Sequence, residues 1–153
     1  LENFEALLLT QPALLILVPV QIGTAGNLGS IMCSRLSTQL HLGALELSPR
    51  NSVVRINSIA ILALAATIFT TVGVAAWAIG GLLGGTLSLG AVLTIAMVSG
   101  GLLAGIVIVL SLTAVTATYH MGYNPDDITI PIVTNVCDVI GVLLLFVVAS
   151  VVL

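Results

Sequence analysis

The sequence has very little charge for its length. Its 153 residues include three Arg, no Lys and six acidic residues, so charged residues make up only 6% of the chain. About 25% is usual in a soluble domain. Hydrophobic residues make up 59%, and so few ionic groups could not cover the surface of a soluble domain of this length. The composition therefore predicts an integral membrane protein, almost all of which lies in the lipid bilayer.

Three further absences exclude other classes of partner and site. The chain has a net charge of −3 and lacks the basic surface that nucleic acid requires, so we expect no nucleic-acid partner. Cys33 and Cys137 lie in apolar segments without CxxC spacing, and we expect them to be small buried residues. Residues 1–5 carry two acids and lack the basic start of a signal peptide, so we expect an excised or processed fragment.

Apolar runs predict four membrane-spanning helices, at residues 5–40, 53–79, 89–119 and 128–153. Each run exceeds the roughly 20 residues that cross a bilayer, and a chain of this length has room for at most four or five such helices. The sequence therefore predicts an all-α, polytopic transmembrane helical bundle. We expect residues 1–153 to form a single transmembrane domain without a soluble domain.

Proline and glycine predict two breaks in these runs. The first span contains Pro12, Pro19 and the polar run 21–27, and we expect it to be interrupted halfway, with locally unwound backbone that lines a wet cavity. A short turn is predicted between the second and third spans, where glycines cluster around Thr86 and Ser88. They are Gly80, Gly81, Gly84, Gly85 and Gly90.

The arginines predict the orientation of the chain. Arg35, Arg50 and Arg55 all lie near the connection between the first two spans. The positive-inside rule therefore places loop 41–52 in the cytoplasm, and counting spans places loop 120–127 there as well. We expect a plasma-membrane protein in which both ends of this chain face the other side.

Small residues recur in the third span: Ser99, Gly100, Gly101, Ala104 and Gly105. They allow two helix backbones to approach closely. We favour packing within the chain over a contact between subunits, although the sequence does not separate the two.

Asp138 is the only ionisable residue deep within a predicted span. It lies about 15 Å along the helix from Ile128, close to the middle of a roughly 30 Å hydrocarbon core. A carboxylate there costs on the order of 3 kcal/mol. No Lys or Arg lies in the interior of a span, so a proton, a transported cation, water or a symmetry mate must compensate it. Alternatively, a protonated Asp138 hydrogen-bonds a neighbouring helix.

Oxygen-bearing side chains accompany Asp138 on two predicted helices. Thr134 and Asn135 precede it by four and three residues and project to the same side. Oxygen ligands select hard cations, and a single carboxylate with retained waters suits Mg²⁺ better than Ca²⁺. A second polar stripe in the first span lines a pore or joins helices. It comprises Gly23, Gly26, Asn27, Ser30, Ser34 and Thr38.

The segment Asn124-Pro125-Asp126-Asp127 is typical of a helix start, with Pro in the first turn and acids at the positive end of the helix dipole. The alternative is that Asp126 and Asp127 concentrate cations at a cytoplasmic mouth. Pro131 is expected to kink or restart the helix that follows.

Four motifs together resemble the membrane domain of MgtE-type magnesium transporters, and most closely the branch that contains the animal solute carriers. The motifs cover nearly the whole chain and occur in the family's order. They are Gly23-Thr24-Ala25-Gly26-Asn27, Ser34-Arg35-Leu36-Ser37-Thr38, Pro125-Asp126-Asp127-Ile128-Thr129-Ile130-Pro131 and Cys137-Asp138-Val139-Ile140-Gly141.

The resemblance implies a transporter rather than an enzyme. It implies a homodimer, or an internally duplicated pseudo-dimer, of five-helix units, in which Asp138 from both halves holds a hydrated Mg²⁺. Residues 23–27 would line the ion pathway, and the backbone carbonyl of Thr134 would face the ion. The four spans would be helices two to five of the family.

The chain departs from bacterial members in having Ile130 where they have Asn, and in lacking their cytoplasmic sensor domains. We predict Mg²⁺ transport through a pathway at a homodimer interface, because a single carboxylate leaves a divalent ion half neutralised. Whether the protein is a channel or an exchanger stays open. The alternatives are a Na⁺- or proton-coupled exchanger of another cation, or a structural membrane subunit that does not transport.

Overall fold

The computed structural model describes residues 11–43 and 51–153, and this part of the chain contains four α-helices and no strand. All four helices are long and apolar enough to cross a membrane, which confirms the predicted fold class. They are α2 (Pro12–His41), α3 (Ser52–Leu82), α4 (Leu89–His120) and α5 (Pro125–Val152).

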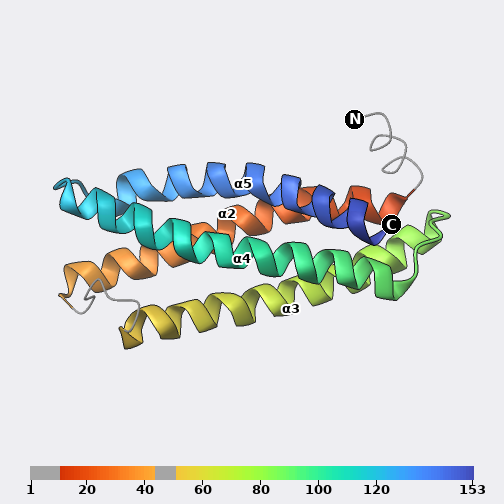
Figure 1. Cartoon of the computed structure of the whole chain (residues 1–153), viewed down its shortest axis with the longest axis horizontal. Coiled ribbons are helices and arrows are strands. Elements are labelled where there is room, and N and C mark those ends of the chain that lie inside the picture. Colours follow the sequence, from red (N-terminus) through yellow and green to blue (C-terminus); the bar gives the residue numbers. More distant parts are fainter. Residues whose placement is uncertain (1–10, 44–50) are drawn as a thin grey trace.

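The helices form one elongated bundle in which consecutive helices run in opposite directions (Figure 1). α2 packs against each of the other three, and α4 packs against both α3 and α5. α3 has no such contact with α5 and therefore lies at the edge of the bundle opposite α5. α2 and α5 are antiparallel neighbours, so residues near the middle of one face residues near the middle of the other.

Polar residues before the helices supply the caps that begin them. The Asn51 side chain accepts a hydrogen bond from the Val53 amide at 2.8 Å, and Ser88 accepts one from the Ala91 amide at 3.2 Å. Such caps satisfy amide groups that have no partner within the helix. Asn124 caps α5 with Pro125 in the first turn, which confirms the predicted helix start. The helix begins three residues before the predicted span at 128–153.

The connection between α3 and α4 is the short glycine turn that the sequence predicts. Gly84 lies there with φ +86°, a conformation that residues with a side chain rarely adopt. Gly80 belongs to the last turn of α3, where an added Cβ would lie 2.8 Å from the Cβ of Ala13. This glycine therefore allows the start of α2 to pack directly on the end of α3.

The interior contains two apolar clusters, one toward each end of the bundle. The first joins all four helices and includes Leu36, Phe69 and Val107. The second lies toward the α3–α4 turn and includes Leu17, Ile95 and Leu145. Cys33 and Cys137 are free and buried, and both belong to the first cluster, as the sequence predicts.

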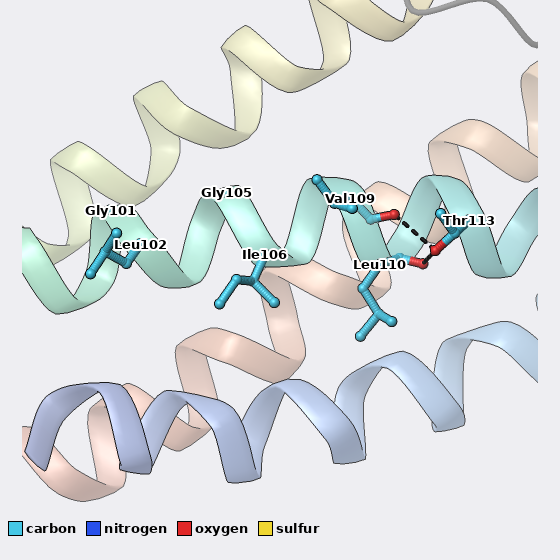
Figure 2. Close-up of a pocket in the computed structure, with 7 residues that line it drawn as sticks. All are labelled: Gly101, Leu102, Gly105, Ile106, Val109, Leu110 and Thr113. Carbon is cyan, nitrogen blue, oxygen red and sulfur yellow. Dashed lines mark hydrogen bonds between the residues drawn. The ribbon is translucent and has the colours of Figure 1, made fainter. Parts of the chain in front are cut away.

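The small residues of α4 divide between the interior and the surface. Ser99, Gly100 and Ala104 are buried, as expected for packing within the chain. An added Cβ on Gly101 or Gly105 meets no atom within 4 Å, and both glycines line an apolar surface groove (Figure 2). The prediction that the small residues of this helix pack within the chain is therefore confirmed for the three buried residues and not for Gly101 and Gly105.

The predicted interruption of the first span is wrong. α2 is helical from Pro12 to His41 and contains Pro19 and the whole polar run 21–27. Unwinding would leave peptide groups without partners in lipid, whereas a glycine within a helix costs only about 1 kcal/mol. Pro131 likewise lies within a continuous α5 and does not restart it.

Residues 1–10 and 44–50, including the start of the first predicted span and Arg50, lie outside the described residues.

We predict that Gly100→Ala lowers the melting temperature of the purified protein. The added Cβ would overlap the ring of Phe69, and overpacking of this kind costs about 1–3 kcal/mol. Gly101→Ala is the matched control on the next residue, where no atom lies within 4 Å. Equal melting temperatures for the two variants would contradict the packing of α3 on α4 described above.

Candidate functional site

Asp138 lies midway along α5 and faces α2. An added Cβ on Gly26 would lie 3.1 Å from Asp138 Oδ1 and 3.6 Å from its Oδ2. Because Gly26 has no side chain, the carboxylate packs directly against the backbone of α2. Gly29 permits the same close approach one turn further on, where an added Cβ would lie 3.1 Å from Cγ1 of Val133. The two glycines of α2 thus create the position that the carboxylate occupies.

The Asp138 carboxylate is not neutralised by this arrangement. Its Oδ1 is buried and has no hydrogen-bond partner. Among the described residues, the permanently charged cations are Arg35 and Arg55. Arg35 is nine residues from Gly26 on α2, about 13 Å along the helix, and Arg55 lies in the first turn of α3. A carboxylate with a buried, unpartnered oxygen requires a proton, a cation or water to compensate it.

Two residues of α5 with oxygen-bearing side chains, Thr134 and Asn135, lie one turn before Asp138. Thr134 is half-buried on the same flank of the helix, and its hydroxyl donates to the Pro131 carbonyl at 3.1 Å. Asn135 is exposed on the outer surface of the bundle. The structure therefore places Thr134 beside Asp138 in the contact with α2, and Asn135 at its outer edge.

The polar stripe of α2 faces the outside of the bundle. Gly23, Asn27, Ser34 and Thr38 are exposed, and Ser30 is half-buried. The Ser30 hydroxyl donates to the Asn27 carbonyl at 3.0 Å, and the Thr38 hydroxyl donates to the Ser34 carbonyl at 2.9 Å. The hydroxyl hydrogens are therefore used within α2, and oxygen lone pairs remain on the outer face.

A groove of about 440 Å³ lies on this face between α2 and α5. It is lined by Ser30, Ile31, Ser34, Arg35 and Ile130. Ser34, Ser30 and Gly26 occupy successive turns of α2, and Ile130, Thr134 and Asp138 occupy successive turns of α5. The groove lining ends at Ser30 and Ile130, about one turn of α2 from Gly26 and about two turns of α5 from Asp138. Ile130 contributes an apolar wall at the position where the resemblance leads one to expect Asn.

The groove on α4 is different in chemistry. It has a volume of about 470 Å³ and is lined by Gly101, Leu102, Gly105, Ile106, Val109, Leu110 and Thr113. Its one hydroxyl, on Thr113, donates to the Val109 and Leu110 carbonyls at 2.9 and 3.0 Å (Figure 2). Apart from the Thr113 hydroxyl, this surface offers apolar side chains and glycine backbone to its surroundings.

Asp126 and Asp127 are not part of the Asp138 site. Both are exposed in the first turn of α5, about 18 Å along the helix from Asp138 for Asp126. Asn124 Nδ2 donates to Asp127 Oδ2 at 3.1 Å. Their position fits both predicted roles, since acids stabilise a helix start and an exposed pair of acids attracts cations.

Sequence reasoning missed Gln21 as an individual residue. The sequence places it in the polar run that is predicted to unwind, whereas the continuous helix buries it to 1% exposure. Its Nε2 has no hydrogen-bond partner. The signal was present in the sequence, because a glutamine among apolar residues in a membrane helix is costly unless it has a polar neighbour.

Within residues 11–43 and 51–153 there is no group of three or more His, Cys, Asp or Glu side chains that could hold a metal ion. Among these described residues, Asp138 is the one acidic residue that lies midway along a helix. Searches of curated proteins and of solved structures found no match. The MgtE family, described as divalent cation transporter, matches residues 18–148, which include α5 through Val148 and all of the site above. The chain belongs to the MgtE family of divalent cation transporters.

Proposed function

We propose that this protein carries Mg²⁺ across the plasma membrane as a homodimer, with Asp138 of each protomer at a central ion site. The observation that carries the proposal is the unpaired carboxylate at the middle of α5, in contact with Gly26 and beside an outward-facing polar stripe. In a membrane protein, an ionisable group in such a position is a functional site by default.

The outer face of α2 and α5 supports a second copy of the chain as the covering partner. The side chains of Asn27 and Asn135 are exposed near mid-depth, where lipid offers amide groups no hydrogen-bond partner. A two-fold axis along this face would place the same stripe of the partner opposite it. The amides and the groove would then line a wet pathway between the two protomers.

The ligand chemistry favours Mg²⁺ as the transported ion. Carboxylate, hydroxyl and amide oxygens suit hard cations, and Mg²⁺ retains most of its water when a protein binds it. One carboxylate neutralises half the charge of a divalent ion, so two copies of Asp138 complete the charge balance. Gly23, Gly26, Asn27, Ser30, Thr134 and Asn135 would line the pathway on each protomer.

The exposed acids and the arginines suggest how the pathway is oriented. We assign Asp126 and Asp127 to the cytoplasmic mouth, where their charge concentrates cations. Loops 41–52 and 120–127 then lie in the cytoplasm. In this arrangement, the four helices are helices two to five of a five-helix unit that is a single transmembrane domain.

We predict that Asp138→Asn lowers Mg²⁺ flux into proteoliposomes by at least about 100-fold. The variant keeps the shape of the side chain and removes its charge, whose attraction for one unit of positive charge 4 Å away is about 4 kcal/mol at an effective dielectric constant of about 20, and about twice that for a divalent ion. Asp126→Asn is the matched control and is expected to lower flux by less than about tenfold, because Asp126 is exposed and its charge is screened.

Wild-type flux in Asp138→Asn would contradict the proposal. The same assay separates the alternatives. Flux that requires an opposing Na⁺ or proton gradient would identify an exchanger. The absence of flux and of stabilisation by any ion in the wild-type protein would identify a structural subunit.

The homodimer proposal is tested by cross-linking in the membrane. We predict that Asn135→Cys gives a covalent dimer with a short bis-maleimide, because Asn135 would face its symmetry mate. Val109→Cys is the control, since Val109 is 63% exposed in the apolar groove of α4. A dimer formed by Val109→Cys and not by Asn135→Cys would place the interface on α4 and would contradict the proposed interface on α2 and α5.

A further inference from the structure

The groove between α2 and α5 contains two side chains whose hydrogen-bond donors are unused. Ser34 and Arg35 are adjacent, exposed and part of the groove lining. Within residues 11–43 and 51–153, neither side chain has a hydrogen-bond or ion-pair partner. Ser30 differs, because its hydroxyl donates to the Asn27 carbonyl at 3.0 Å. The groove therefore presents a permanent positive charge with a free hydroxyl beside it, a set of donors that suits an anion.

Two exposed residues of α3 indicate where the groove lies relative to the bilayer. Arg55 and Trp77 are 22 positions apart, about 33 Å along the helix, which is close to the thickness of a hydrocarbon core. Both residue types are typical of the boundary between hydrocarbon and headgroups. Ala13 packs on Gly80, and counted from that contact Arg35 lies about 5 Å nearer the middle of the bundle than Arg55. Arg35 therefore lies just inside the boundary, within reach of lipid phosphates.

The described part of the chain supplies no ion pair for this arginine. Asp126 precedes Ile130 by one turn of α5 and so lies toward the same end of the groove, but it forms no ion pair with Arg35 in the part of the chain that the structure describes. Asp127 instead accepts a hydrogen bond from Asn124 Nδ2 at 3.1 Å. A charge without a partner is costly in contact with lipid. An anion from the surroundings is therefore the group that completes the site.

We propose that this groove binds the headgroup phosphate of an anionic membrane lipid through Arg35 and Ser34. The guanidinium pairs with two phosphate oxygens, and the Ser34 hydroxyl donates to a third. Ile31 and Ile130, the apolar members of the lining, contact the first carbons of an acyl chain. Basic pockets between membrane helices bind lipid headgroups in this way.

The lining favours a lipid over the other possible occupants. A free phosphate ion makes no use of the apolar wall formed by Ile31 and Ile130. A second copy of the chain related by a two-fold axis through the groove brings two unpaired Arg35 side chains together, and like charges repel. In the proposed dimer, the groove lies at the end of the α2–α5 face nearer the α4–α5 turn. The lipid then leaves the stretch around Asn27 and Asn135 to the partner, and its phosphate cancels a positive charge that opposes the entry of a cation.

The test is a titration of the purified protein in neutral detergent with phosphatidylglycerol, followed by the melting temperature. We expect phosphatidylglycerol to raise the melting temperature more than phosphatidylcholine, whose choline group carries a positive charge beside the phosphate. Arg35→Gln is expected to raise the phosphatidylglycerol concentration at half of this effect by about tenfold or more, which corresponds to the loss of one hydrogen bond to a charged group. Arg35→Lys keeps the charge without the planar fork and is expected to fall between the two.

Arg55→Gln is the matched control, because Arg55 is an exposed arginine at the same end of the bundle that does not line the groove. It is expected to keep the wild-type titration. Equal shifts in Arg35→Gln and Arg55→Gln would overturn the inference, since the lipid would then respond to net charge alone. Equal stabilisation by inorganic phosphate at the same concentration would also overturn it and would identify a site for a free anion.

A fourth measurement tests the second copy as the occupant. If Arg35→Gln lowers the fraction of dimer and leaves the phosphatidylglycerol titration unchanged, the groove is an interface between protomers and the inference is wrong. We expect the opposite result, an unchanged fraction of dimer and a weakened lipid titration. These readouts do not require Mg²⁺ transport, so they are independent of the test of Asp138.

Discussion

The contact between the Asp138 carboxylate and the backbone of α2 at Gly26 is the constraint on which the site depends. A charge at mid-depth is tolerated only where protein, water or an ion replaces lipid. Gly26 and Gly29 bring α2 and α5 together closely enough to enclose the carboxylate on one side. They provide no opposite charge, so a proton, water or a cation is needed to compensate the carboxylate.

The surface of α4 and the outer face of α2 and α5 differ in how well lipid can cover them. The groove on α4 presents apolar side chains and a hydroxyl that is satisfied within its own helix, so acyl chains can cover it at no cost. The α2–α5 face presents amides and a groove that contains Arg35. We infer that another copy of the chain covers the second face. The difference between the two faces therefore determines which of them forms the interface between protomers.

Much of the fold could be predicted from the sequence because apolar length and capping residues act locally. The four spans, the start of α5 at Asn124 and the glycine turn at Gly84 all follow from a few neighbouring residues. The predicted interruption of the first span is wrong, because unwound backbone in lipid costs more than glycine and proline cost within a helix. The position of Asp138 midway along an apolar helix can be predicted from the sequence, whereas its contact with Gly26 and the burial of Gln21 depend on how two distant helices pack.

In the proposed dimer, two carboxylates, one from each of two chains, hold one divalent ion. The most direct measurement is an equilibrium titration of purified protein in lipid nanodiscs with Mg²⁺, from which the number of tightly bound ions per chain is obtained. The account predicts one Mg²⁺ for every two chains. One ion per chain, or no saturable binding, would contradict it.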